Sequence, residues 1–396
     1  MSDWQTIRAD DYCDSVRDGT HDSPKPVEKG HRLITSKHIA NGALCFDGAN
    51  CISDEDYAAI NLRSKVDVND LLFSMIGTVG RVYRVDTEPD FAIKNMGLFK
   101  LSDETKSKYL YYFLQSPEAK NYIDACLAGS TQKFMSLGSL RGFPIIYPSD
   151  ETMMAKIVLI LDALTQAIRN NRQTNDCLHD ICEAKYEKLC YEAPHKLLGE
   201  IIVSIESGSR PKGGAEASGI PSIGAEKIEK FGRYDYGSEK YVSAEFFQKL
   251  KRGIVKSGDV LLYKDGAYAG KVTMALSGFP FKICAINEHV FKLNTRGNNE
   301  QNFLYFTLAN AKTRQRVFGL ASSKAAQPGL NQGEIQSVEI PLPTLEERLA
   351  FDSEVQPFMD LIAANALESR ELANLRDALL PKLMSGEIDV SNVELP

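Results

Sequence analysis

Two long segments of the chain carry apolar residues at helical spacing. Within 149–190 these residues follow the four–three–four spacing of a coiled-coil seam, and a comparable stripe recurs within 345–385. A helix of about 40 residues is about 60 Å long and needs a surface that covers its apolar stripe. We predict that the two helices pair with each other, and packing of each helix on its own globular domain is the alternative. The predicted seam residues are Ile157, Leu161, Leu164, Ile168, Leu178, Val355, Phe358, Ile362, Leu372, Leu375 and Leu379.

Two polar residues, Asn171 and Asn175, interrupt the first stripe where apolar residues are expected. A buried asparagine between paired helices can fix their register at a cost in stability. The alternative is that the asparagines mark the point where the seam rotates away from the partner helix. The sequence leaves both interpretations open.

The segments before the two stripes have the pattern of β-rich globular domains. Short runs of alternating apolar residues are separated by Gly, Asn, Asp and Pro, and short helical patterns lie near 105–126 and 300–319. We therefore predict five parts, namely a first domain (1–148), a first long helix (149–192), a second domain (193–343), a second long helix (344–386) and a tail (387–396).

The two halves of the chain repeat each other. "VNDLLFSMIGTVGRV" (68–82) matches "SGDVLLYKDGAYAGKV" (257–272), and the second copy has one extra residue. "AIKNMGLFKL" (92–101) parallels "AINEHVFKL" (285–293), and "YLYYFL" (109–114) parallels "FLYFTL" (303–308). Because these matches occur in the same order with nearly constant spacing, they indicate an internal duplication.

The glycines of the first match resemble a nucleotide-binding loop, but their context does not. A phosphate-binding loop runs directly into a helix. Here Arg81 and Lys271 begin β-rich runs instead, "RVYRV" and "KVTMAL". We therefore predict a hairpin of strand, glycine turn and strand in each half, and no ATP site.

Composition is typical of a globular protein, with 396 residues, 43% apolar and 25% charged. No apolar run approaches the roughly 18 residues that span a bilayer, and the polar N-terminus does not resemble a signal peptide, so we expect a cytoplasmic protein. The eight cysteines form no C-x-x-C pair, which predicts free thiols and no metal site. The net charge of −7 is uneven, because residues 196–343 carry +6 and residues 344–396 carry −7.

Motifs for catalysis are missing from the sequence. There is no N/D-P-P-Y/F/W motif of an amino-methyltransferase, and the six histidines are scattered. Asp90 followed by Glu104 and Lys106 resembles a metal-nuclease pattern, but "SDETKSKYLYYFL" (102–114) is typical of a helix start capped by Ser102 or Asp103. The lack of these motifs agrees with a pure binding protein.

Several motifs together resemble the specificity subunit of Type I restriction–modification systems. They are "GSTQKFMSLGSLRGFPIIYPSDE" (129–151), "EIPLPTLEERLAF" (339–351), "LRDALLPKLMSGEIDV" (375–390) and the two glycine hairpins. The resemblance implies an α+β fold of two tandem β-rich target recognition domains, with the long helices pairing as an antiparallel coiled coil. It also implies double-stranded DNA as a partner, each domain reading one half of an asymmetric, bipartite target. Two methyltransferase subunits would dock on the helices and a motor-nuclease subunit could join. S-adenosylmethionine is expected in the methyltransferases, and no cofactor in this chain.

Loops that combine small residues with Arg, Lys, Asn, Gln, Ser or His are the candidates for DNA contact. Arg or Lys suits guanine and phosphate, Asn or Gln suits adenine, and glycine lets the backbone come close. In the first half the candidates are Arg17, Thr20, His21, Lys25, Lys37, His38, Arg81, Arg84, Lys94, Asn95, Ser130, Thr131, Gln132 and Lys133. In the second half they are Ser209, Arg210, Lys212, Lys227, Tyr263, Lys264, Lys271, Asn287, His289, Ser323, Lys324 and Gln327.

Two other functions share these sequence features. The chain could be the separately encoded specificity subunit of a fused restriction–methylation enzyme, which has the same layout. It could also be a coiled-coil scaffold that reads no DNA. Sequence-selective, salt-sensitive DNA binding would exclude the scaffold.

Overall fold

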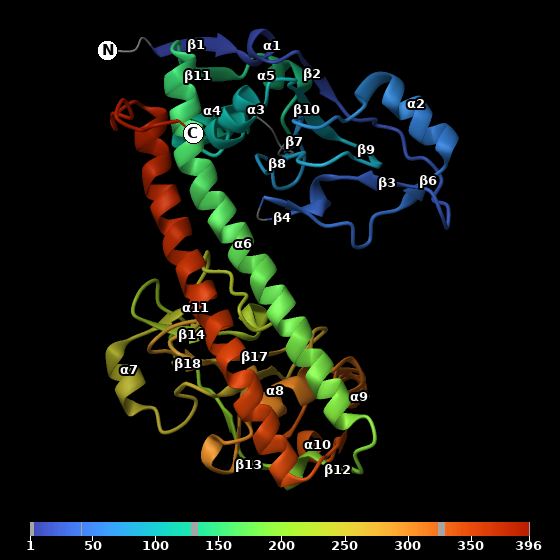
Figure 1. Cartoon of the computed structure of the whole chain (residues 1–396), viewed down its shortest axis with the longest axis vertical. Helices are drawn as coiled ribbons and strands as arrows, with labels where there is room; N and C mark the ends of the chain where they lie inside the picture. Colours follow the sequence, from blue (N-terminus) through green and yellow to red (C-terminus); the bar gives the residue numbers. More distant parts are fainter. Residues whose placement is uncertain (1–3, 41, 128–133, 324–328, 396) are drawn as a thin grey trace. The chain divides into compact units, whose positions relative to one another are not determined.

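The computed structural model describes residues 4–40, 42–127, 134–323 and 329–395 (Figure 1). The chain forms two compact units, residues 1–166 with 373–396, and residues 167–372. Two helices of 40 residues, α6 (Glu151–Cys190) and α11 (Leu345–Met384), each contribute a segment to both units. Each unit also contains one β-rich globular part that is followed by a long helix, and this confirms the predicted α+β fold class.

The centre of the first unit is a four-stranded sheet of order β2-β10-β7-β8. Its strands are β2 (Ser15–Asp18), β7 (Leu71–Ser74), β8 (Val82–Arg84) and β10 (Met96–Lys100). A three-stranded sheet has the order β6-β3-β9, with β3 and β9 parallel. Its strands are β3 (His31–Ile34), β6 (Cys51–Ile52) and β9 (Phe91–Ile93). Two strand pairs complete the unit, β1 (Trp4–Arg8) with β11 (Pro144–Pro148) and β4 (Ile39–Ala40) with β5 (Ala43–Leu44).

Short helices cover these sheets. They are α1 (Ala9–Tyr12), η1 (Ser36–His38), α2 (Asp54–Ser64), α3 (Glu104–Phe113), α4 (Pro117–Leu127) and α5 (Leu137–Arg141). The Asp103 side chain caps α3 by accepting a hydrogen bond from the Lys106 amide at 2.8 Å. Glu104 therefore lies in the first turn of a helix, as predicted, and not on the strand that a metal-nuclease motif would need.

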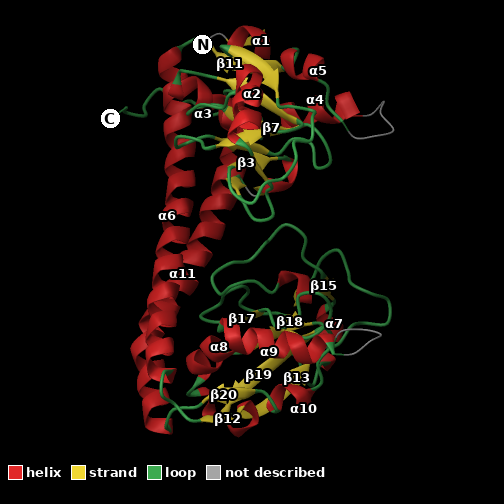
Figure 2. Ribbon diagram, turned by 90° about the vertical axis from the view of Figure 1, so that its right-hand side faces the viewer, coloured by secondary structure: helices red, strands yellow, loops and turns green. Residues whose placement is uncertain are grey.

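The second unit repeats this arrangement (Figure 2). Its four-stranded sheet has the order β13-β19-β16-β17, its three-stranded sheet the order β15-β14-β18, and β12 pairs with β20. The strands are β12 (His195–Leu197), β13 (Ile202–Ser207), β14 (Ile220–Ile223), β15 (Tyr241–Val242), β16 (Val260–Tyr263), β17 (Val272–Met274), β18 (Ala285–Ile286), β19 (Val290–Thr295) and β20 (Glu339–Pro341). The short helices are η2 (Leu198–Glu200), η3 (Ala225–Lys227), α7 (Ala244–Lys249), η4 (Arg296–Asn298), α8 (Gln301–Ala309), α9 (Ala311–Ser322) and α10 (Gln332–Gln336).

The match in strand order confirms the internal duplication. β7 and β8 form an antiparallel hairpin, and β16 and β17 form its counterpart, so the predicted glycine hairpins are also confirmed. Leu71 pairs with Arg84 in the first hairpin, and Val260 pairs with Met274 in the second. The additional residue of the second copy therefore lies in the turn and leaves the strand register unchanged.

The long helices run antiparallel where they meet within a unit. In the second unit Lys185 of α6 forms an ion pair with Glu354 of α11 at 2.5 Å, and Asn171 donates to Glu368 at 2.9 Å. Asn175 donates to the Ile362 carbonyl at 3.1 Å. Asn171 and Asn175 thus face α11, so the alternative that the seam turns away at this point is wrong. Pro357 lies inside α11.

The apolar stripes also pack on the globular parts, so both predicted arrangements occur together. Ile157 and Leu161 of α6 share a core with Leu383 of α11 and with α3 of the first unit. Tyr186 of α6 and Val355 of α11 share a core with α8 of the second unit.

The predicted seam residues differ in burial. The buried ones are Ile157, Leu161, Ile168, Val355 and Ile362, and the half-buried ones are Leu164, Leu178, Phe358, Leu372 and Leu379. Leu375 does not fit the prediction, because 48% of its surface is exposed. Within the ranges that the structure describes, no helix has the length and apolar character that crossing a bilayer requires.

Candidate DNA interface

In the first unit the pairing of β2 with β10 brings two candidate loops together. The Asn95 amide donates to the Thr20 carbonyl at 3.1 Å, and the His21 ring Nδ1 lies 2.8 Å from Asn95 Oδ1. Lys94 Nζ contacts the Ser23 hydroxyl in the same place. Asn95 adopts a positive φ of 53°, which turns the chain sharply from β9 into β10. The segment after β2 and this turn therefore form one polar surface.

The first hairpin contacts a second candidate segment. Arg81, which follows the glycine turn, donates from Nη1 to the Ile39 carbonyl at 2.9 Å. Gly77 and Gly80 have φ values of 77° and 95°, a conformation that side chains with a Cβ rarely adopt. The turn thus directs Arg81 toward the segment that begins with η1.

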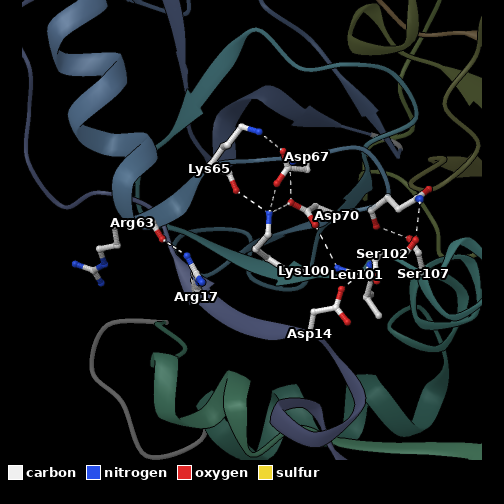
Figure 3. Close-up of polar contacts among 11 residues, drawn as sticks. Asp14, Arg17, Arg63, Lys65, Asp67, Asp70, Lys100, Leu101, Ser102 and Ser107 are labelled. Atoms are coloured by element: carbon white, nitrogen blue, oxygen red, sulfur yellow. Dashed lines mark hydrogen bonds and ion pairs between the residues drawn. The ribbon is translucent and has the colours of Figure 1, made fainter.

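Two arginines of this unit, Arg17 and Arg81, have guanidinium charges that no carboxylate of the described residues neutralises. Arg17 donates to the Arg63 carbonyl at 3.0 Å (Figure 3). Arg81 donates to the Ile39 carbonyl, so both guanidinium groups bind main-chain oxygens. No described carboxylate lies within ion-pair distance of either one. Arg84 differs, because Asp86 holds it at 2.8 Å. Arg17 and Arg81 are accordingly the better placed groups for phosphate contact.

A buried carboxylate fixes the base of the hairpin (Figure 3). Asp70 accepts hydrogen bonds from Lys100 Nζ and from the Asp67 amide, both at 2.7 Å. Burial raises the pKa of Asp70, and the Lys100 ammonium opposes that shift. The second unit has Asp259 at the equivalent place, where the Asn294 amide nitrogen donates at 2.6 Å. Each copy therefore anchors its hairpin through the aspartate that precedes the strand.

In the second unit three candidate loops meet around one histidine. The His289 ring Nδ1 lies 2.9 Å from Asp265 Oδ2, and the Lys264 amide donates to the His289 carbonyl at 3.2 Å. Arg210 forms an ion pair with Glu288 at 2.9 Å. The loop after β13, the hairpin and the turn between β18 and β19 therefore form one surface, equivalent to that of the first unit.

Most cations of this second surface already have an acidic partner. Lys271 pairs with Glu229 at 2.6 Å, Lys264 lies 3.9 Å from Asp265, and Arg210 pairs with Glu288. Lys212 is exposed and has no ion pair with a described residue. The net charge of +6 for residues 196–343 therefore overstates the free positive charge at these loops.

Three predicted DNA contacts lie inside the protein. Lys227 is 6% exposed, and its ammonium donates to the Asp235 carbonyl at 2.6 Å and to Ser238 at 3.0 Å. The His38 ring Nδ1 accepts from the Thr35 amide at 2.9 Å, and Asn287 Oδ1 accepts from the His289 amide at 2.9 Å. These side chains hold their loops in shape, and the prediction that they touch DNA does not fit their burial.

The remaining candidates fall into three groups. Lys25, Lys37 and Ser323 are exposed, and Ser209 and Tyr263 are half-buried. Six candidates lie outside the described residues, namely Ser130, Thr131, Gln132, Lys133, Lys324 and Gln327. An exposed aromatic side chain of the second hairpin was not among the predictions, namely Tyr268 at its tip. The signal that could have identified it is the extra residue of the second copy.

One group of side chains, within the part of the chain that the structure describes, has spacing compatible with a metal ion. His179, Asp180 and Glu183 place one ligand atom each within 4.8 Å of one another. Burial lowers the pKa of His179 to about 4, which leaves the imidazole neutral. However, the Lys230 ammonium lies 3.7 Å from Asp180, where it would repel a cation. We assign no metal to this group.

Comparison with known proteins gives consistent results. The profile of a family described as "Type I restriction modification DNA specificity domain" matches residues 1–180 and 198–375. The MjaIX specificity subunit of a Type I restriction enzyme from Methanocaldococcus jannaschii is 25% identical over 316 residues, 74% of this chain and 71% of that protein. The putative MjaX specificity subunit from the same organism is 22% identical over 98% of this chain and 94% of its own length.

A solved structure supports the fold. The Type I restriction–modification S subunit from M. genitalium superposes with a TM-score of 0.58 over 96% of each chain, at 15% sequence identity. At this identity the likeness concerns the fold alone.

Proposed function

Because the chain belongs to the family of Type I restriction–modification DNA specificity domains, we propose that each of its two globular domains reads one half of a bipartite DNA target. The observation that carries this proposal is the repeated surface. In each unit the glycine hairpin and the turn that precedes β10 or β19 lie next to other polar loops. The four-stranded sheets that carry these loops have the same strand order in both units. Domains built alike would contact DNA alike, with base-edge contacts made by the loops.

The differences between the two surfaces support an asymmetric target. The first carries Arg17, Arg81 and Asn95, while the second carries Asp265, His289 and paired lysines. Arginine suits guanine and asparagine suits adenine, whereas a carboxylate accepts from cytosine. Half-sites read by such different side chains would differ in sequence.

The helices are the proposed docking surface for methyltransferase subunits. Large apolar side chains are exposed on both of them, at Ile181 of α6 and at Leu345, Leu349 and Leu361 of α11. Exposed apolar groups at a contact surface are typical of sites where a protein partner binds. The chain itself would make no covalent change in DNA, and the partner would supply S-adenosylmethionine and the methyl transfer. A motor-nuclease subunit could join the complex.

The test is selection of DNA by the full chain purified with its methyltransferase partner. A pool of random-sequence duplexes is bound, recovered and sequenced over several rounds. We expect enrichment of two short, different sequences at a fixed spacing. The variant with Arg17→Ala and Arg81→Ala is expected to relax or weaken one half-site only, and the variant with Lys264→Ala and Lys271→Ala the other.

Two results would contradict the proposal. Absence of any enriched sequence at low salt would favour the scaffold alternative. Loss of both half-sites in each variant, with the fold intact by circular dichroism, would mean that the loops do not read separate halves. A methyltransferase partner that also carries the nuclease would identify the fused-enzyme arrangement without changing the reading role.

A further inference from the structure

We propose that Tyr268 of the second domain inserts its ring between neighbouring base pairs of the half-site that this domain reads. The inference rests on the proposed function and adds a specific contact to it. Tyr268 lies at the tip of the β16–β17 hairpin, and 63% of its surface is exposed. The same domain buries several of its large rings, among them Tyr305 and Phe306, whereas Phe318 on α9 is 42% exposed. An exposed ring on a loop that faces a ligand offers a large apolar contact area with little loss of side-chain entropy.

The turn that carries Tyr268 is rigidly held. The Gly270 amide donates to the Tyr263 carbonyl at 2.8 Å, and the Lys271 amide donates to the Tyr268 carbonyl at 3.1 Å. The next residue, Ala269, is buried in the core of the domain. A Cβ at Gly270 would lie 3.4 Å from atoms of α9, so the turn packs closely on that helix. Tyr268 therefore projects from a turn that is held in place, and insertion between base pairs requires such support.

One cation lies beside the ring. Lys271 Nζ lies 4.9 Å from the centre of the Tyr268 ring and 2.6 Å from Glu229, so this ammonium would contact a phosphate by exchanging its acidic partner. A cation over an aromatic ring stabilises the position of the ring. Stacking of an aromatic ring on bases is tolerant of sequence, because every base has an aromatic face.

The first hairpin has no exposed aromatic residue at its tip, and its shorter turn explains the difference. In the first copy a single residue, Thr78, separates Gly77 from Val79, which packs against the core as Ala269 does. In the second copy two residues fill that place, Ala267 and Tyr268. The extra residue is thus the one that lets an aromatic side chain project. We expect insertion at one half-site only.

The experiment places an indole at this position. The sequence has a single tryptophan, Trp4, so the Tyr268→Trp variant adds one emission signal to a constant background. The probe is the duplex selected by the wild-type chain. We expect that binding quenches the added emission by at least half and protects it from acrylamide, since indole stacked on bases is quenched. The matched control is Tyr191→Trp, at an exposed tyrosine after α6 in the same unit, whose emission should not change.

Affinity separates insertion from a contact by the hydroxyl group. Tyr268→Ala is expected to weaken binding about tenfold, within the range measured for base–aromatic stacking. Tyr268→Phe keeps the ring and should bind within about twofold of the wild type. Equal losses in Tyr268→Phe and Tyr268→Ala would overturn the inference, as would unchanged emission of the tryptophan at 268 on saturating DNA. If the wild-type chain selects no duplex at all, the proposed function fails and the insertion fails with it. If it selects one and the emission is unchanged, only the insertion fails.

Discussion

Stability of the second unit is expected to depend on pH through two buried groups that act in opposite directions. Burial raises the pKa of Asp352 on α11 to about 7, against two hydrogen bonds that lower it. These come from the Asn302 and Phe303 amides at 2.9 and 2.7 Å, at the start of α8. Burial also lowers the pKa of His179 on α6 to about 4, and the Lys230 charge adds to that shift.

The signs of the two contributions follow from proton uptake. Asp352 binds a proton more readily in the folded than in the unfolded chain, so its contribution is present at low pH and is lost as the pH rises toward 7. His179 binds a proton more readily in the unfolded chain, so its contribution grows as the pH rises from 4 toward 6.5. Over pH 5 to 6.5 each contribution changes by about 2 kcal/mol, at about 1.4 kcal/mol per pH unit. The wild-type unit should therefore be nearly insensitive to pH in this interval.

A single substitution removes the pH-dependent contribution of one group, so the free energy of unfolding then follows the contribution of the other. We expect Asp352→Asn to make the free energy of unfolding rise by about 2 kcal/mol from pH 5 to 6.5, and His179→Gln to make it fall by about as much. Both variants are also less stable at every pH, because each loses a buried hydrogen bond, so the slope is the quantity to compare. The control is Asp360→Asn on the same helix, where the side chain is exposed.

The assay is urea unfolding at three pH values, followed by far-ultraviolet circular dichroism. Trp4 lies in the first unit, so its fluorescence follows that unit separately and should show no difference between the variants. An Asp352→Asn protein whose unfolding free energy stays flat between pH 5 and 6.5 would refute the reasoning.

Three further predictions concern DNA contact and packing. Replacing Arg17 and Arg81 by Ala should lower the affinity for DNA and reduce the slope of log K against log salt by about 2, because two phosphate contacts are lost. Fluorescence anisotropy measures both quantities, and an unchanged slope would mean that neither arginine contacts a phosphate. Asn175→Ala should destabilise the second unit by about 1–3 kcal/mol in urea unfolding, because the Asn365 amide loses its acceptor; additive losses in the double variant with Asn365→Ala would contradict this coupling. Asp70→Ala should cost about 1–3 kcal/mol, because the Asp67 and Leu101 amides lose their acceptor while Lys100 keeps its ion pair with Asp67 at 2.8 Å. The loss is measured as a lower urea midpoint of Trp4 fluorescence, and an unchanged midpoint would contradict the anchoring role of Asp70.

The fold could be predicted from the sequence because its signals are local and occur twice. Glycines at the hairpin turns and apolar spacing in the long helices each depend on a few neighbouring residues. The resemblance to a known family added the antiparallel direction of the helices. The asparagines at 171 and 175 could be interpreted only in part, since which way they face depends on the packing of α6 against α11.

The candidate site was less predictable because charge and exposure depend on tertiary contacts. Lys227 lies in a loop of the expected composition, yet its ammonium is buried and donates hydrogen bonds to Asp235 and Ser238. Lys271 and Arg210 looked free in the sequence, but acidic residues far along the chain neutralise them. Composition identifies the candidate loops. It does not show which of their charged side chains are buried or form ion pairs in the folded protein.

The duplication shows how one arrangement of sheets can carry two different loop surfaces. The aspartate before the hairpin is present in both copies, but a different side chain donates to it, Lys100 in the first and Asn294 in the second. In the second copy Lys292 Nζ also lies 3.7 Å from this aspartate, so the anchoring is kept while the side chains that provide it change. At the tip, a single inserted residue adds an exposed tyrosine without shifting the strand register. Because loops tolerate such changes far better than paired strands do, the proposed half-site preferences can change while the sheets stay the same.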